Sequence, residues 1–145
     1  MVPEDVADWR ERRREAAAVH GEALARREAG ESAKARVLLA AFVAQATERG
    51  IAPVRLRARS YDGRHRYRTS TDGWYLKLNE SVAVGTDGEF YVLGVPASLL
   101  ALVRGATVEP SEPPLVLGKG GRDGESIDLP DALAMVLERN TPQGA

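Results

Sequence analysis

The sequence predicts an α+β fold: two N-terminal helices packed on an antiparallel β-meander of about four strands, with a C-terminal helix. Three observations support it. Apolar residues recur at helical spacing up to Gly50, the period changes to two from Ile51, and Pro130 opens a last helical segment. The length of 145 residues fits one domain with one core. We therefore expect a single domain over residues 1–145, with its segments at 1–50 (helical), 51–95 (meander), 96–140 (crossover and last helix) and 141–145 (frayed tail).

The first 50 residues are predicted to form two helices. Residues 3–29 are charged and alanine-rich, with Pro3 suited to a first helical turn. A second helix after Gly30 should supply the core through Val37, Leu38, Phe42, Val43 and Ala46. A single interior glycine costs a helix only about 1 kcal/mol. The sequence therefore leaves open whether Gly30 is a loop or a weak point in one long helix, and we favour an antiparallel helix pair.

The segment that follows Gly50 is predicted as β-structure. Asp-Gly dipeptides are strong hairpin signals, because tight turns need positive φ angles, and they occur at Asp62-Gly63, Asp72-Gly73 and Asp87-Gly88. They divide the segment into strands at 52–60, 65–71, 74–85 and 89–95, and the sequence leaves open a break of the third strand near Asn79-Glu80. We expect Trp74 and Tyr75 to be core or sheet-face residues.

The chain after Pro96 mixes short elements. We expect a short helix over 97–105 with a glycine stop, rather than another buried strand, and a short strand at 115–117. The glycine-rich segment 118–124 lacks the residue order of a phosphate-binding loop and is interpreted as a surface turn. The last helix should face the core with Leu133, Val136 and Leu137.

Composition limits the possible functions and locations. The chain contains no cysteine, which excludes disulfides and thiolate metal sites and favours a reducing compartment. The longest apolar runs are far shorter than the roughly 20 residues of a membrane span. The N-terminal residues are acidic, where a signal peptide would be basic and then apolar. We expect a cytoplasmic protein that needs no membrane and no cofactor.

The hairpin around Asp62-Gly63 is the strongest candidate for a binding site. If the turn has two residues, Arg59 faces Arg66, Arg57 faces Arg68, and Arg55 extends the same face opposite Ser70. The other face would carry Leu56, Ala58 and Tyr67 toward the helices. The anion-binding candidates are therefore Arg55, Arg57, Arg59, Arg66 and Arg68.

Two explanations of this arginine cluster remain open. Like charges opposite each other are unfavourable, so an anion should lie nearby, either a phosphate backbone or another polyanion. Alternatively, carboxylates of the first helix or of the acidic C-terminal half neutralise the arginines within the chain, or the arginines are simply solvated, and we favour this reading. A net charge of −1 and a pI of about 6.2 argue against a dedicated nucleic-acid-binding protein.

The first helix is the candidate contact with a partner. Its apolar side chains are too few to gain much from packing inside one subunit. We expect it to join a second copy of the chain or another protein through Val6, Trp9, Val19 and Leu24.

No group of residues predicts catalysis or metal binding. His20 and His65 are isolated in the sequence, and Ser60, Asp62 and His65 lie in a turn that does not aim them into a triad. We assign no catalytic residue and no metal ligand. The predicted function is a non-catalytic binding or regulatory protein that acts through protein contacts or self-association, with a polyanion-binding or nucleic-acid-binding module as the alternative and an enzyme less favoured.

Arginine is in excess over lysine. Together with the segments Gly73 to Leu93 and Pro113 to Leu137, this excess makes the chain resemble small proteins of high-GC actinobacteria. This resemblance implies a bacterial source and no activity, cofactor or site residue.

Overall fold

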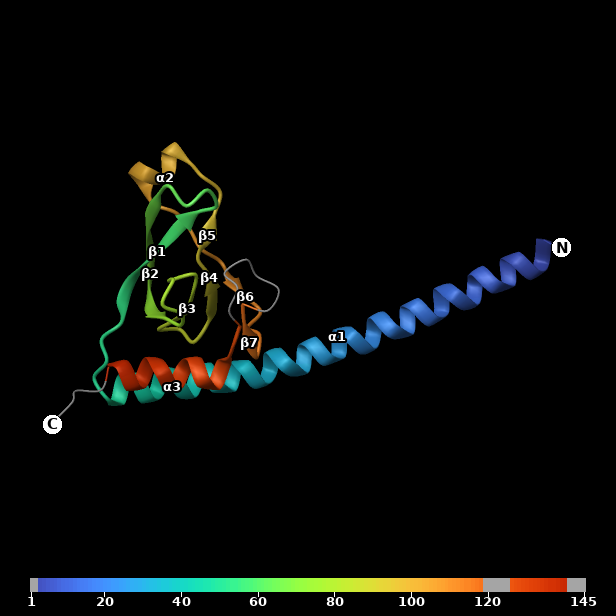
Figure 1. Ribbon diagram of the computed structural model, residues 1–145, viewed down its shortest axis with the longest axis horizontal. Coiled ribbons are helices and arrows are strands. Elements are labelled where there is room, and N and C mark those ends of the chain that lie inside the picture. The colour runs from blue at the N-terminus through green and yellow to red at the C-terminus, as the bar shows by residue number, and fades with distance from the viewer. Residues whose placement is uncertain (1–2, 119–125, 141–145) are drawn as a thin grey trace.

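The computed structural model describes residues 3–118 and 126–140, and shows an α+β fold from which one long helix projects (Figure 1). Helix α1 spans Pro3–Glu48 without interruption. The expected pair of N-terminal helices is therefore wrong. Gly30 lies inside the helix, and an added Cβ there would meet nothing within 4 Å. The cost of one glycine is small beside the cost of a turn, because residues 3–29 have too few apolar side chains to pack back on the second half.

Only the C-terminal part of α1 belongs to the core. Ala35, Leu39, Phe42 and Ala46 follow one another at helical spacing, and each is at most 2% exposed. The prediction placed Phe42 and Ala46 correctly, and Leu38 and Val43 pack at the margin of the core. Val37 was wrongly assigned to the core, because it lies on the outer side of the helix and is 69% exposed.

The sheet is mixed and has six strands in the order β5-β1-β2-β3-β4-β6. The predicted antiparallel meander forms its centre, since β1 to β4 pair in sequence. The last predicted strand is divided in two, and its second part pairs in parallel with β1. The strands are β1 Val54–Ser60, β2 Arg66–Tyr75, β3 Val82–Gly85, β4 Phe90–Val92, β5 Gly94–Val95 and β6 Pro110–Ser111.

Leu93 closes the meander on itself. Its backbone N–H donates to Ser81 beside β3 at 2.9 Å, and its carbonyl accepts from the N–H of Arg59 in β1 at 2.7 Å. One segment of chain thus joins the last strand of the meander to the first. The curled sheet encloses its own apolar cluster, which consists of Leu56, Ala58, Ala83, Tyr91, Leu93 and Val108.

Two of the three Asp-Gly signals form hairpin turns as predicted. Gly63 and Gly88 have φ angles of 74° and 80°, values that glycine adopts at little cost. The third prediction was wrong, because β2 runs through Asp72-Gly73 without turning. Gly73 pairs with Gly85 of β3, and a Cβ on Gly73 would clash with the carbonyl oxygen of Val84. This glycine therefore permits close strand approach, and the turn to β3 comes later, where Glu80 has a φ of 59°.

Short elements complete the fold, several of them as predicted. Helix α2 spans Leu99–Arg104 and is followed by the expected glycine stop. Strands β7, Val116–Leu117, and β8, Ile127–Asp128, form a two-stranded sheet before helix α3, Leu129–Arg139. The tail and most of the glycine-rich segment lie outside the described residues.

Helices α3 and α1 lie side by side below the curled sheet in Figure 1. Leu133 and Val136 of α3 are buried as predicted, and Leu137 packs at the margin. Trp74 joins the sheet to α1: its ring meets Phe42 edge to face at 5.7 Å, and its indole N–H donates to the carbonyl of Ile51 at 3.1 Å. Trp74 is thus a core residue, as expected from the sequence.

Substitution of Gly73 by alanine tests the close approach of β2 and β3. We expect Gly73→Ala to lower the free energy of unfolding by about 1–3 kcal/mol, because the backbone of β3 must move to admit the new methyl group. Urea denaturation monitored by circular dichroism measures this change. Gly30→Ala is the matched control, and it should raise stability slightly because the methyl group enters open space in a helix. Equal stability of Gly73→Ala and wild type would contradict the packing described.

Candidate interaction surfaces

The β1–β2 hairpin has the register that the sequence predicted near its turn. Arg57 lies opposite Arg68, and Arg59 lies opposite Arg66. The loop is wider than the expected two residues, since the backbone N–H of Ser60 donates to His65 and closes a loop over residues 61–64. The widening leaves the pairing of the arginines unchanged, because Ser60 and His65 keep the same register.

One face of the hairpin is buried and the other exposed, as expected, but the prediction that the buried face packs toward the helices was wrong, because the sheet curls over it. Leu56, Ala58 and Tyr67 are at most 1% exposed and fill the inside of the curled sheet. Side chains alternate along a strand, so the arginines between them must point outward. We call the four outward residues Arg57, Arg59, Arg66 and Arg68 the arginine face.

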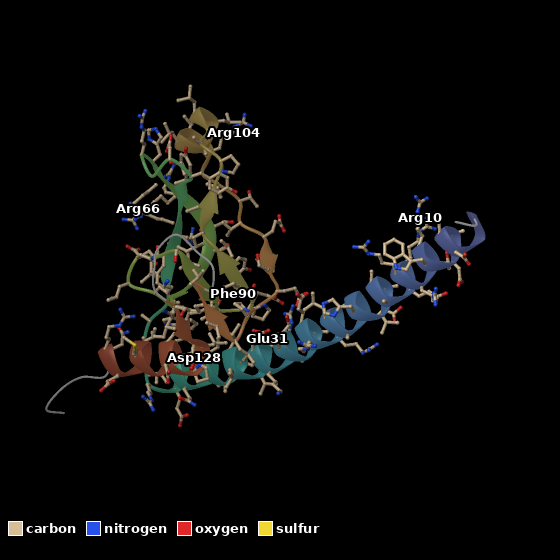
Figure 2. All side chains as sticks on the ribbon, turned by 45° about the vertical axis from the view of Figure 1, so that its right-hand side comes forward. Arg10, Glu31, Arg66, Phe90, Arg104 and Asp128 are labelled. Atoms are coloured by element: carbon tan, nitrogen blue, oxygen red, sulfur yellow. The ribbon has the colours of Figure 1, made fainter. Side chains whose placement is uncertain are left out.

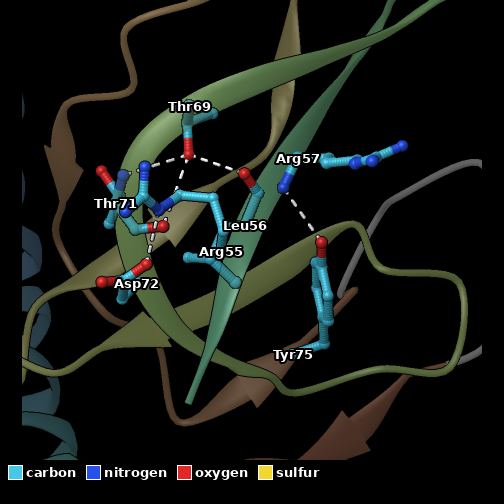
Figure 3. Close-up of polar contacts among 7 residues, drawn as sticks. All are labelled: Arg55, Leu56, Arg57, Thr69, Thr71, Asp72 and Tyr75. Atoms are coloured by element: carbon cyan, nitrogen blue, oxygen red, sulfur yellow. Dashed lines mark hydrogen bonds and ion pairs between the residues drawn. The ribbon is translucent and has the colours of Figure 1, made fainter.

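Arg55 does not extend this face in the predicted way. The register shifts between Arg55 and Arg57, so that Arg55 lies opposite Asp72 and not Ser70. The Thr69 hydroxyl holds the irregularity in place, since it donates to the carbonyl of Leu56 at 2.7 Å and accepts from the N–H of Thr71 at 3.2 Å (Figure 3). The bulge brings the Arg55 guanidinium to 2.6 Å from the Asp72 carboxylate. Arg55 is therefore neutralised within the hairpin.

Counter-charges reach only part of the arginine face. Arg66 pairs with Glu80 at 2.9 Å, and Arg68 donates to the carbonyl oxygen of Val103 at 3.2 Å. Among the described residues, the guanidinium groups of Arg57 and Arg59 have neither an ion pair nor a side-chain hydrogen bond. The carboxylates expected from the first helix or the C-terminal half are not the ones used, because Asp72 and Glu80 belong to β2 and to the turn after it. Two arginines with exposed side chains thus remain available for an anion.

The residues of the hairpin turn stabilise the turn itself. The Ser60 hydroxyl donates to the Asp62 carboxylate at 2.6 Å, and this bond, together with the N–H of Arg64, lowers the pKa of Asp62 below its usual value. The backbone N–H of His65 donates to the Ser60 hydroxyl, and the His65 ring stacks beside Tyr67. The side chains of Ser60 and Asp62 therefore cap the turn, while the His65 ring takes no part in a relay with them.

The first half of α1 forms the second candidate surface. Residues 5–30, which we call the α1 arm, project away from the sheet, and Arg10 lies far from the core (Figures 1 and 2). Trp9 and Leu24 are 54% and 45% exposed, and Val6 is partly covered by its neighbours on the helix. Val19 is 63% exposed.

Helix geometry separates one of the four predicted contact residues from the others. At 3.6 residues per turn, Val6 and Leu24 are five turns apart and lie on the same side, and Trp9 lies about 60° from them. Val19 lies about 140° from Leu24, and therefore on another side of the arm. A single stripe along the arm can therefore include Val6, Trp9 and Leu24 but not Val19. Arg13 covers part of the Trp9 ring, with its guanidinium carbon 5.1 Å from the ring centroid.

Helix α2 is a third surface, which the sequence did not single out. Leu99, Leu100, Leu102 and Val103 are between 45% and 83% exposed, and none of the residues of α2 is buried. The apolar run from Leu99 to Val103 indicated a helix, and such runs ordinarily pack inward. The serine cap and the glycine stop define the helix, but they carry no information on which side is covered.

The described residues contain hollows but no cluster of reactive groups. A cavity of about 370 Å³ lies where Trp74, Tyr75 and Leu78 face Val136 and Arg139. Burial, with help from a hydrogen bond to Asp87, raises the pKa of Tyr91 to about 12, so this hydroxyl stays protonated and supports the β3–β4 turn. No three metal-ligating side chains gather within residues 3–118 and 126–140, nor does any helix there have the length and apolarity to cross a membrane.

The described residues thus present three exposed surfaces, which are the arginine face, the α1 arm and helix α2. Comparison of the chain with protein-family models, with curated proteins and with solved structures finds no match in any of the three.

Proposed function

We propose that this protein is a non-catalytic binding protein that self-associates through the α1 arm. The observation that supports this most is the α1 arm, a stretch of about 26 residues of helix α1 that carries an exposed tryptophan and projects away from the rest of the described residues (Figure 1). An isolated helix gains little stability in water without packing of an apolar face. Tryptophan is also enriched at the centres of protein interfaces. A second helix laid along Val6, Trp9 and Leu24 would supply the missing contact.

Charge favours a second copy in antiparallel orientation. Asp5 lies near one end of the arm and Arg27 near the other, and within the described chain neither has an ion-pair partner. Antiparallel pairing about Ala16 and Ala17 places Arg27 of one copy within one position of the residue that faces Asp5 of the other copy. The same register places Trp9 opposite Leu24 and small alanines at the crossing point, where the helices can approach closely.

A parallel pair is less favourable. It would align the run Arg12-Arg13-Arg14 with the same run of the second copy. Like charges at such positions repel across a helix pair. Antiparallel pairing separates the two runs along the axis.

Removal of the tryptophan should weaken this association. We expect Trp9→Ala to raise the dissociation constant of the dimer by about tenfold or more, because a buried interface tryptophan contributes about 2 kcal/mol. Light scattering over a concentration series measures the mass. Val19→Ala, on another side of the arm, is the control and should leave the mass unchanged. A wild type that stays monomeric at every concentration would sink the idea.

Engineered cysteines can establish the orientation, and the absence of native cysteine makes the result unambiguous. In the antiparallel register, Val6→Cys of one copy meets Arg27→Cys of the other, so a mixture of the two variants should form a disulfide-linked heterodimer on mild oxidation. Val6→Cys alone should stay uncrosslinked, because the two thiols would lie about 31 Å apart at 1.5 Å per residue. Non-reducing electrophoresis distinguishes these cases. Crosslinking of Val6→Cys with itself would show a parallel pair instead.

The arginine face supports a second candidate function, the binding of polyanions. Arg57 and Arg59 stand opposite other arginines and have no carboxylate of their own among the described residues. Guanidinium groups in a fixed row suit phosphate or sulfate oxygens, which they contact with paired hydrogen bonds. Because the net charge of the chain is slightly negative, such an attraction must come from a local concentration of positive charge.

Heparin chromatography tests the second candidate. We expect wild type to be retained, and Arg57→Ala/Arg59→Ala to elute at clearly lower salt, because each lost phosphate or sulfate contact reduces counterion release. Arg49→Ala/Arg139→Ala removes the same charge elsewhere and should elute nearly as wild type does. If both double variants shift equally, only net charge matters and the arginine face is not a site.

A further inference from the structure

Helix α2 presents its apolar side chains to the outside. Successive residues turn by about 100°, so Leu99, Leu100, Leu102 and Val103 lie on one broad side of the helix. Ala101 is half-buried on the opposite side. A helix on a domain surface ordinarily turns its large apolar residues inward and its small or polar residues outward. The four exposed residues, which we call the α2 patch, have the reverse arrangement, and exposed apolar patches on soluble domains mark interaction sites.

Polar contacts hold α2 in place without using this patch. The Ser98 hydroxyl accepts from the N–H of Ala101 at 3.2 Å, and the N–H of Ser98 donates to the Tyr67 hydroxyl at 2.9 Å. The Arg68 guanidinium donates to the last turn of the helix at Val103. Because these contacts fix both ends of α2, the patch is presented on a positioned support.

The chain after α2 adds a further constraint. The N–H of Ala106 donates to the carbonyl of Arg68 at 2.7 Å, which satisfies the free edge of β2. Gly105 has a φ of 84°, and a Cβ there would lie 2.7 Å from the same carbonyl oxygen. Only glycine allows the segment to lie this close. The position of α2 on β2 is therefore part of the fold, while its apolar side chains contribute little to the core.

The surroundings of the α2 patch are basic. Arg68 reaches the helix directly, Arg57 lies opposite Arg68 on the neighbouring strand, and Arg104 ends α2. Arg66 and Arg104 both lie toward the end of the domain away from α1 (Figure 2). Arg57 and Arg59 have exposed guanidinium groups without carboxylate partners in the described chain. An occupant of this region therefore meets aliphatic side chains and unpaired positive charge together.

We propose that the α2 patch and the adjoining arginine face form a docking site for an acidic amphipathic helix of another protein. The inference rests on the anion-binding role proposed for the arginine face and names the kind of partner. Leucine-type side chains on one side of such a helix would cover the α2 patch. Glutamates beside that apolar stripe would pair with Arg57 and Arg59, whose planar groups suit carboxylates. Arginine is also enriched over lysine in protein interfaces.

Two other occupants fit these features less well. A nucleic-acid backbone would use the arginines but would leave the aliphatic side chains without a partner, since such interfaces are polar and strongly charged. A membrane surface would cover aliphatic groups, but helices that lie on membranes carry a strongly charged polar face opposite the apolar one. Helix α2 has the half-buried Ala101 on that side.

Fluorescence anisotropy with two designed peptides tests the proposal on the full chain. Both probes are 18-residue helices with leucine at positions i, i+3, i+4 and i+7, and one carries glutamate and the other lysine beside the stripe. We expect the glutamate peptide to bind at least about tenfold more tightly than the lysine peptide. Leu99→Ser/Val103→Ser and Arg57→Ala/Arg59→Ala should each weaken its binding by about tenfold or more, a change equal to about 1.4 kcal/mol.

The control variant is Leu78→Ser, which replaces a side chain that is 78% exposed away from α2 and should bind as wild type does. All substituted side chains are exposed, so circular dichroism should show wild-type folding.

Equal binding of both peptides, or wild-type affinity in Leu99→Ser/Val103→Ser, would overturn the proposal. Heparin retention without glutamate-peptide binding would leave the arginine face as a polyanion site and reject the protein partner. Sedimentation with phosphatidylglycerol vesicles that is lost in Leu99→Ser/Val103→Ser would assign the patch to a membrane instead.

Discussion

The hydrogen bonds of Leu93 are the constraint on which the arrangement of this domain depends. By donating beside β3 and accepting from β1, this residue turns an open meander into a curled sheet. Closure gives the sheet a definite inside, which Leu56, Ala58 and Tyr91 fill. It also fixes the outside, because the inward Leu56 and Ala58 of β1 are each followed by an outward arginine. The arginine face is thus a direct consequence of closing the sheet, whatever it binds.

The unpaired edge of β2 explains the position of α2. The pairing of β2 with β3 begins only at Gly73, so the part of β2 near Arg68 would present an unpaired edge. Unpaired edges expose backbone donors and acceptors to other chains, and folded proteins generally cover them. Here the segment after α2 covers the edge through Ala106. This backbone contact uses no side chain of α2, and the large side chains of α2 stay exposed.

The sequence was most informative where a local pattern has one structural meaning. Alternation in the hairpin predicted its register and its buried face, and two Asp-Gly pairs predicted their turns. Prediction failed where one residue type can have two different structural roles. Gly73 relieves a contact with Val84 that only the folded sheet creates, and Gly30 is tolerated because nothing approaches it. The pairing of Arg55 with Asp72 depends on a bulge, and the exposure of α2 depends on a contact with a strand edge that is distant in the sequence. The spacing of residues along the sequence predicts neither feature.

The α1 arm and the α2 patch lie far apart on the described part of the molecule. The α1 arm leaves the domain beside α3, and α2 lies at the opposite end of the sheet (Figure 1). The buried residues between Ala35 and Ala46 tie the arm to the core. Occupation of one surface therefore leaves the other accessible, and a dimer formed through the arm would carry two α2 patches, which lets weak individual contacts combine through their effective concentration.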